Sequence, residues 1–203
     1  MFKFLFAAIL ILSSFFQAPA FPDAHEYAPL LEKDLTYENW EYKDVKTNQK
    51  IDLREFAADK KLVMVVYFAP WCHNSNYQAP VIKKLYDKYK HEGFAVIGVG
   101  LYASSARIED TKDRLELDFP VVTDSSSTKD REKTLHYKYR IAVGDTRKWG
   151  TPWNLFFDPQ EISGDRDVIT TKPVIVNGEV RLQEAEYFIR KKLGLPPETA
   201  AGN

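Results

Sequence analysis

The chain of 203 residues contains a single cysteine, Cys72, in a setting that favours a reactive thiol. A run of β-forming residues, 62–68, precedes it, and a helical pattern begins at the cysteine itself. A buried strand is therefore expected to pass into a helix N-terminus at this point. Unpaired N–H groups and the positive end of the helix dipole stabilise a thiolate there, and the thiolate is the nucleophile. The sequence predicts that Cys72 carries the chemistry.

Three neighbours of Cys72 could take part in that chemistry. Ser75 follows one helical turn later, so its hydroxyl is expected to donate a hydrogen bond to the sulfur. Trp71 is expected to pack beside the sulfur and limit its exposure. His73 could add positive charge when protonated, or it could be an exposed histidine, since adjacent residues on a helix point apart. The sequence leaves both interpretations of His73 open.

No metal or cofactor site is expected. His25, His91 and His136 show no common spacing, and all three are interpreted as surface residues. A lone thiol next to His73 falls short of the donor set that a copper or zinc site needs. One cysteine also excludes an intramolecular disulfide, so Cys72 has no structural role of that kind.

The residues around Cys72 match a known pattern. Phe68-Ala-Pro-Trp-Cys-x-x-Ser75 follows a strand, Pro80 lies in the next helix, and Gly150-Thr151-Pro152 precedes a later strand. Over residues 40–194 the chain resembles the thioredoxin superfamily, and most of all its exported thiol-disulfide oxidoreductase branch (TlpA/redoxin-like). The resemblance implies a thioredoxin-like α/β fold, with a central mixed β-sheet between layers of α-helices.

The resemblance also implies a substrate-binding surface. In this family a cis-proline loop lies against the active-site turn, which places Pro152 beside Cys72. Thr151 would then offer its backbone to a substrate strand. Trp71 and His73 would contact the same substrate.

Two departures from the family pattern change the expected chemistry. Ser75 stands where the family has its second cysteine, and Val66 stands where many members bury an acid. Ser75 cannot resolve a mixed disulfide on Cys72, so an external resolving thiol is required. Expected substrates are protein or low-molecular-weight thiols and disulfides, in mixed-disulfide formation, isomerisation or deglutathionylation.

Three other functions compete with this one. The first is a redox-inactive binding module of the same fold, in which the groove near Pro152 holds a client. The second is a one-cysteine peroxidase, which ranks lower because such enzymes place a threonine where this chain has Ala69. The third is metal delivery, which the donor set disfavours. Sensitivity of Cys72 to alkylation at low pH separates thiol-disulfide exchange from simple binding.

The first twenty residues predict export. Lys3 gives a short positive start, residues 4–16 are an apolar run, and Ala18-Pro-Ala20 has the small-x-small pattern before a cleavage site. A membrane anchor is the alternative, but about 13 residues of helix span only ~20 Å of a ~30 Å hydrocarbon core. We therefore expect a periplasmic or secreted protein with four parts: signal peptide 1–20, N-terminal lead 21–39, thioredoxin-like domain 40–194 and tail 195–203.

Charge and pattern complete the expectations. The formal net charge is −1, which argues against nucleic-acid binding, and no stretch after the signal can span a membrane. We expect a monomer built from alternating strands and helices. The irregular parts are a polar lead at 22–38 and a surface loop at 158–172. Between them we expect a hairpin at 40–45 and 49–52, helices at 53–59, 72–91, 104–115, 129–139 and 183–193, and strands at 62–68, 94–99, 119–123, 153–157 and 173–176, with an Asn177-Gly178 turn into a strand at 179–182.

Overall fold

The computed structural model describes residues 25–162 and 164–196. Its strands are β1 (Leu31–Glu32), β2 (Tyr37–Glu38), β3 (Glu41–Asp44), β4 (Lys50–Asp52), β5 (Leu62–Phe68), β6 (Phe94–Gly100), β7 (Val121–Thr123), β8 (Trp153–Phe157), β9 (Val168–Thr170) and β10 (Val174–Val176). Its α-helices are α1 (Leu53–Ala57), α2 (His73–Tyr89), α3 (Ser105–Arg114), α4 (Leu135–Ala142) and α5 (Leu182–Lys192). Short 3-10 helices are η1 (Lys90–Glu92), η2 (Thr128–Lys133) and η3 (Pro159–Glu161). The predicted signal peptide lies outside the described residues.

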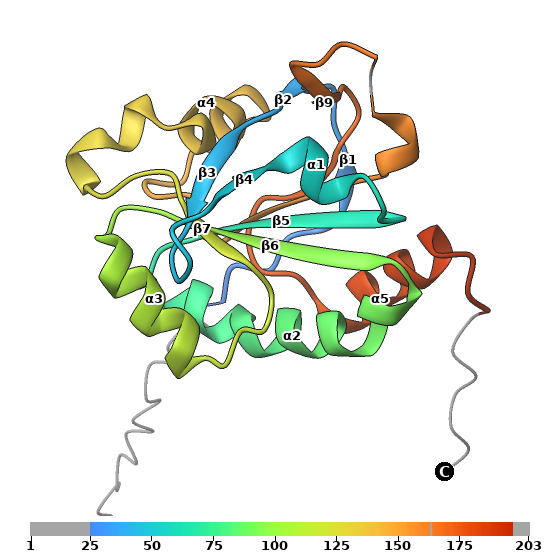
Figure 1. The fold of residues 1–203 in the computed structure, drawn as a ribbon, viewed down its shortest axis with the longest axis horizontal. Helices are drawn as coiled ribbons and strands as arrows, with labels where there is room; N and C mark the ends of the chain where they lie inside the picture. Colours follow the sequence, from blue (N-terminus) through green and yellow to red (C-terminus); the bar gives the residue numbers. More distant parts are fainter. Residues whose placement is uncertain (1–24, 163, 197–203) are drawn as a thin grey trace, which may run out of the picture.

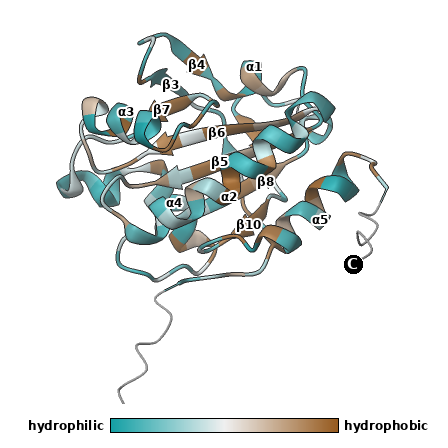
Figure 2. Cartoon of the chain, turned by 90° about the horizontal axis from the view of Figure 1, so that it is seen from below, coloured by the Kyte–Doolittle hydropathy of each residue, from teal (hydrophilic) through white to brown (hydrophobic). Residues whose placement is uncertain are grey.

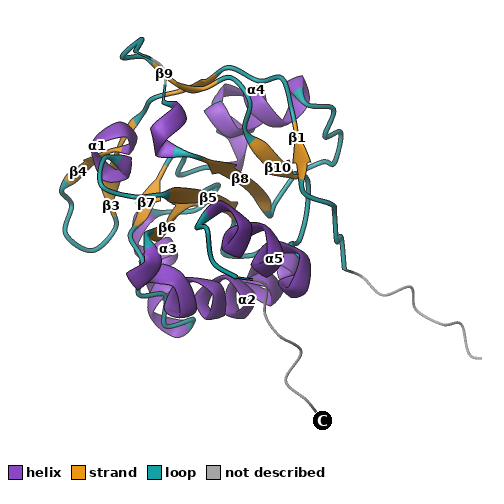
Figure 3. Cartoon of the chain, turned by 90° about the vertical axis from the view of Figure 1, so that its right-hand side faces the viewer, coloured by secondary structure: helices purple, strands orange, loops and turns teal. Residues whose placement is uncertain are grey.

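A mixed eight-stranded sheet is the centre of the molecule, in the order β1-β10-β8-β5-β6-β7-β3-β4. Strand β5 pairs in parallel with β6 and antiparallel with β8. Helices α1 and α4 lie on one face of the sheet, and α2, α3 and α5 lie on the other (Figures 1 and 3). The predicted fold class, a mixed sheet between helical layers, is confirmed.

All seven residues of β5 are buried because alternate side chains enter two different cores. Val63, Val65 and Tyr67 pack in the core that includes α1 and Tyr139 of α4. Their neighbours Met64, Val66 and Phe68 pack in the core that includes α2, α3 and α5. Figure 2 shows the same arrangement, with apolar central strands and hydrophilic outer helix faces. A strand that is covered on both faces has a continuous run of apolar residues, and this run is what predicts β5 from the sequence.

The N-terminal lead is more ordered than expected. We expected residues 22–38 to be irregular, but β1 pairs with β10 and β2 pairs with β9 at the edges of the fold. Tyr37 is fully buried, and its hydroxyl lies 2.7 Å from the hydroxyl of Tyr67. This contact explains the error, since two-residue strands have no recognisable period and are fixed by tertiary packing.

Three further expectations were wrong in detail. The helix expected at 129–139 is divided into η2 and α4 at Thr134, which has extended backbone and caps α4 by accepting from the N–H of Tyr137. No hairpin forms after Asn177-Gly178: Glu179 makes a single bridge to Tyr27, and α5 begins at Leu182. The loop expected at 158–172 contains η3 and β9, and β9 is held by pairing with β2.

Within the described part of the chain, no helix has the length and apolar character needed to cross a bilayer.

Candidate functional site

Cys72 is the N-cap of α2, as the sequence predicted. Its backbone N–H donates to the carbonyl of Ala69 at 3.0 Å, closing the turn that follows β5. The side-chain amide of Asn76 donates to the carbonyls of Pro70 and Cys72, at 3.0 and 2.7 Å. These bonds fix the turn from both sides and leave the thiol half-buried. Strand β5 therefore delivers a partly accessible sulfur to a helix N-terminus.

The cis-proline loop meets this sulfur. The peptide bond between Thr151 and Pro152 is cis, as the family resemblance implied. The thiol of Cys72 donates a hydrogen bond to the carbonyl oxygen of Thr151 at 3.2 Å. Residues separated by 79 positions in the sequence thus form one site, and the carbonyl that a substrate strand would use is within reach of the nucleophile.

His136 supports the loop from inside the protein, which corrects our interpretation of it as a surface residue. It is fully buried, with Nε2 3.0 Å from the carbonyl of Gly150 and Nδ1 3.0 Å from the hydroxyl of Tyr102. A carbonyl can only accept, so Nε2 carries the proton and Nδ1 accepts from Tyr102. Burial lowers the pKa of His136 to about 3, because the imidazolium would lose its hydration. The ring is therefore neutral at physiological pH.

Arg140 fixes the chain just before the cis-proline. It is almost completely buried, and its guanidinium donates to the carbonyls of Asp145, Arg147 and Lys148. Gly150 has φ of +61°, and a Cβ at this position would clash with Cδ of Arg140. Only glycine combines this backbone conformation with such a close approach. The loop that presents Thr151 is therefore rigidly held.

Trp71 lies beside the site, but its closest described partners are aromatic residues. Its indole N–H donates to the carbonyl of Tyr102 at 3.3 Å, and its ring packs edge-on against Trp149 with centroids 5.1 Å apart. Trp149 precedes Gly150, so the two indoles connect the cysteine turn to the loop. They form an aromatic wall on this side of Cys72.

Ser75 does not make the hydrogen bond to Cys72 that we expected. Its side chain is buried, and its Oγ is a buried polar atom that makes no hydrogen bond to Cys72 or to any other described group. It lines a small cavity of about 20 Å³ together with apolar side chains that include Val66, Phe68 and Phe119. The cavity lies where the family's second cysteine and buried acid would be expected. The hydroxyl therefore does not stabilise the sulfur in this structure.

His73 and His25 lie together at the start of α2. The side chain of His73 is exposed, and its ring is 6.3 Å from that of His25. His25 stacks on Tyr77 at 3.7 Å and pairs through Nδ1 with the buried carboxylate of Glu179 at 3.3 Å. Our interpretation of His25 as a surface residue is wrong, because its side chain is only 16% exposed, whereas His91 is exposed as expected. No spacing in the sequence indicates that His25 reaches α2.

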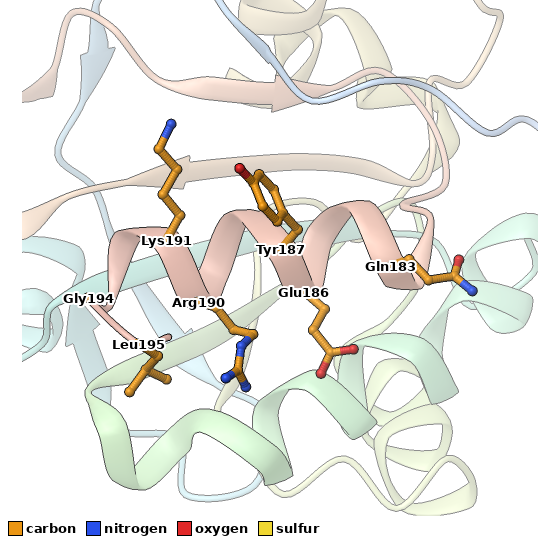
Figure 4. Close-up of a pocket in the computed structure, with 7 residues that line it drawn as sticks. All are labelled: Gln183, Glu186, Tyr187, Arg190, Lys191, Gly194 and Leu195. Carbon is orange, nitrogen blue, oxygen red and sulfur yellow. The ribbon is translucent and has the colours of Figure 1, made fainter. Parts of the chain in front are cut away.

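A second candidate site is the open pocket on α5 in Figure 4. Two of its charged side chains, Glu186 and Arg190, point towards α2 and form hydrogen bonds with residues of that helix. Glu186 accepts from Lys88 and from the hydroxyl of Tyr89, and Arg190 donates to the same hydroxyl. This pocket contains no cysteine among its lining residues, so Cys72 remains the better candidate for thiol chemistry. Among the described residues no cluster of three metal-ligating side chains is present.

Comparison with known proteins identifies the family. Residues 34–162 match the AhpC/TSA family, and the chain belongs to this family. The match begins within the N-terminal lead, after β1, and ends just after η3, so it includes the cysteine turn and the cis-proline loop. No match was found among curated proteins.

Solved structures show the thioredoxin-like fold. The thioredoxin domain of a thiol-disulfide oxidoreductase from Bacteroides vulgatus is 16% identical, with TM-score 0.57 over 80% of this chain and 99% of that chain. A putative thiol:disulfide interchange protein DsbE from Chlorobium tepidum is 18% identical, with TM-score 0.54 over 84% and 100%. A secreted disulfide oxidoreductase from Mycobacterium tuberculosis, homologous to E. coli DsbE, is 14% identical, with TM-score 0.51 over 76% and 94%. These likenesses establish the fold of the chain.

Proposed function

We propose that this protein is a thiol-disulfide oxidoreductase that works through one nucleophilic cysteine, Cys72. The observation that carries the proposal is the position of the sulfur. It is half-buried at the N-terminus of α2 and 3.2 Å from the carbonyl that precedes cis-Pro152. Family membership and the names of the three similar structures described above, which are oxidoreductases or interchange proteins, support the same activity.

The exchange step follows from this arrangement. Cys72 releases its proton to solvent, which ends the hydrogen bond to Thr151, and the thiolate attacks one sulfur of a substrate disulfide. The new bond joins Cys72 to that sulfur, the old S–S bond breaks, and the other substrate sulfur leaves as a thiolate. The freed carbonyl of Thr151 can then accept a backbone N–H of the substrate.

The protein itself cannot complete a second step. No other cysteine exists in the chain, and Ser75 occupies the place one turn after Cys72. The mixed disulfide therefore persists until an external thiol attacks it. Isomerisation and deglutathionylation require only this pair of steps, and we assign the protein to that monothiol class.

The test is the rate at which Cys72 reacts with a disulfide peptide, followed by intact mass. The folded protein should form one adduct, faster than the same chain unfolded in denaturant, and Cys72→Ser should form none. A folded protein that reacts more slowly than the unfolded chain would contradict the proposal, because the fold would then protect the thiol instead of activating it.

We also propose that the protein is exported. The support is the charged start, apolar run and small-x-small pattern of residues 1–20, together with the secreted relative from Mycobacterium tuberculosis. Material recovered outside the cytoplasm should begin at Phe21 or a near neighbour in N-terminal mass spectrometry. An intact Met1 in a membrane fraction would contradict cleavage.

A redox-inactive binding module is the second candidate, and one observation favours it. In this structure the thiol donates to Thr151 and receives no hydrogen bond from Ser75. The carbonyl and sulfur would then act only as a surface for a client. This function predicts that Cys72→Ser binds clients as well as the parent does, whereas exchange predicts that covalent capture is lost.

A further inference from the structure

A basic pocket lies next to the proposed exchange site. It has a volume of about 390 Å³ and is lined by Thr128, Lys129, Arg131, Glu132, Lys133 and Trp149; we call it the Trp149 pocket. The ring of Trp149 is 5.1 Å from that of Trp71, the residue before Cys72. Trp149 also stands two positions before Thr151, whose carbonyl contacts the sulfur. The pocket and the nucleophile therefore share one aromatic wall.

This part of the chain is strongly basic. Residues 128–149 contain seven Lys or Arg and three Asp or Glu side chains, a net charge of +4 in a chain whose formal net charge is −1. The pairs Arg131–Glu132 and Lys133–Asp130 lie within the segment and are already counted in this net charge. Outside the segment, Glu38 pairs with Lys138 and Glu26 pairs with Arg147, which reduces the excess to +2. Lys129 lines the pocket and makes no ion pair within the described residues.

Two cationic side chains lie close to the aromatic ring of the pocket. The guanidinium of Arg131 and the ammonium of Lys148 each lie 5.6 Å from the ring of Trp149. Cations held over an indole keep their ability to bind an anion, because the ring neutralises no charge. The pocket thus combines a flat apolar wall with an excess of positive charge.

We propose that the Trp149 pocket binds the external resolving thiol, and that this thiol is a small molecule with carboxylate groups. The inference rests on the proposed function, which requires a thiol from outside. The volume is that of a small-molecule site. Lys129 and Lys133 would hold the carboxylates, and Trp149 would contact the organic part. The thiol group would then face the aromatic wall that the pocket shares with Cys72.

The reaction balances as two exchanges. The bound thiolate attacks the sulfur of Cys72 in the mixed disulfide, the bond to the client breaks, and the client leaves as a thiolate that takes a proton from water. A second molecule of the small thiol attacks the sulfur of the first. The bond to Cys72 breaks, Cys72 leaves as a thiolate, and a small-molecule disulfide forms. The client disulfide gains two electrons, and each small thiol loses one.

The first experiment compares two probes that differ in charge. Glutathione carries two carboxylates and its diethyl ester carries none, so each is used to release a peptide from Cys72 at low salt. Rates are divided by those for the same mixed disulfide in unfolded protein, which removes the difference in thiol reactivity. Glutathione should be favoured by about fivefold, as expected for one or two solvent-screened charge contacts. This preference should shrink in high salt.

Matched variants locate the effect. Lys129→Glu with Lys133→Glu should abolish the preference for glutathione. The control pair Lys84→Glu with Lys43→Glu changes the net charge equally, at exposed positions on α2 and β3, and should leave the preference unchanged. Equal corrected rates for both probes in the parent would overturn the proposal. A preference that survives in the pocket variant would also overturn it.

A binding measurement keeps this test separate from the proposed function. S-methylglutathione has no thiol, so its binding does not depend on the reactivity of Cys72. It should quench the fluorescence of the parent saturably, with the signal lost in Trp149→Phe and affinity at least fivefold weaker in the Lys129 and Lys133 variant. Saturable binding with an inert Cys72 would reject exchange but keep the pocket. A reactive Cys72 without such binding would keep exchange but reject the pocket.

Discussion

The two sides of the first turn of α2 differ sharply in how they are built. On one side, the sulfur of Cys72 meets a loop that His136 and Arg140 hold with hydrogen bonds from inside the protein. On the other side, Ser75 places an unpartnered hydroxyl in a small apolar cavity next to Val66. The side that would form a mixed disulfide is held by several hydrogen bonds. The side that would resolve one has neither a thiol nor a polar partner.

The largest expected effect comes from giving the second side a thiol. Ser75→Cys places two sulfurs one helical turn apart, which is within disulfide reach, and the cavity leaves room for the larger atom. The variant should form an internal disulfide under mild oxidation, measured as a loss of two mass units. It should also gain insulin reduction that the parent lacks.

This gain should be incomplete, because Val66 supplies no acid to assist the second thiol. Ser75→Ala is the matched control and should show no insulin reduction. If Ser75→Cys forms no internal disulfide, the assigned position of the active-site turn is wrong. If the parent reduces insulin as fast as the variant, the single-cysteine mechanism is wrong.

The next effect tests the bonded side. His136→Phe leaves the carbonyl of Gly150 and the hydroxyl of Tyr102 buried without their partner. Each such group costs about 1–3 kcal/mol, so urea unfolding should show a loss of about 2–6 kcal/mol. Reaction of Cys72 with a disulfide peptide should slow more than reaction with a small neutral disulfide, since only the peptide uses Thr151.

His136→Gln is the conservative comparison, because an amide can both donate and accept. It should recover part of the stability and of the peptide reactivity. Equal stability of the parent and the Phe variant would show that His136 does not support the loop.

These contacts also show what the sequence could and could not predict. The strand β5, the helix α2 and the cis-proline loop were predictable, because a continuous apolar run, a helical period and a motif each leave a local signal. His136 was missed, since a lone histidine in a helix has no partner visible along the chain. A weak signal did exist in the spacing, because residues three and four positions apart lie on one face of a helix. The structure shows that this face of α4 is the buried one, with His136, Tyr139 and Arg140.

The role expected for Ser75 failed for a different reason. One helical turn of separation places two residues on neighbouring positions, but it does not decide which way a small side chain points. Cys72 is the N-cap and has extended backbone, so its sulfur turns towards Thr151, whereas Ser75 is already inside the helix and faces the core. The strands β1 and β2 were missed because their pairing partners lie more than a hundred residues away.

A smaller effect is a pH dependence of stability. Burial depresses the pKa of folded His136 from 6.5 to about 3, so between these values the unfolded chain binds more protons than the folded one. The contribution of the neutral ring is therefore fully present above about pH 6.5 and is lost as the pH falls towards 3. Its slope approaches about 1.4 kcal/mol per pH unit.

The measurement is urea unfolding of the parent and His136→Gln between pH 4 and pH 7. Subtracting the unfolding free energy of the variant from that of the parent cancels the contributions of other titrating groups. One of these is Asp124, whose pKa is raised by burial. The difference in unfolding free energy should decrease steadily as the pH falls from about 6.5, because only the parent has this imidazole to protonate. A difference that stays constant would contradict the neutral, buried state of the ring.

The smallest effect belongs to Ser75→Ala. The hydroxyl is buried and makes no hydrogen bond, so its removal loses no partner and relieves a desolvated polar group. Unfolding free energy should change by less than about 1 kcal/mol, in the stabilising direction if it changes. Asn154→Leu is the contrasting variant, because it breaks the buried amide pair with Gln78 and should destabilise clearly. A large loss of stability in Ser75→Ala would reveal a role for the hydroxyl.

The lifetime of a mixed disulfide on Cys72 tests the central claim most directly. The folded protein is treated with one equivalent of a disulfide peptide, excess reagent is removed, and intact mass is followed with and without an added thiol. The account predicts a single adduct on Cys72 that persists for as long as thiol is absent and disappears when thiol is added. No adduct on the folded protein, or an adduct that decays without added thiol, would contradict it.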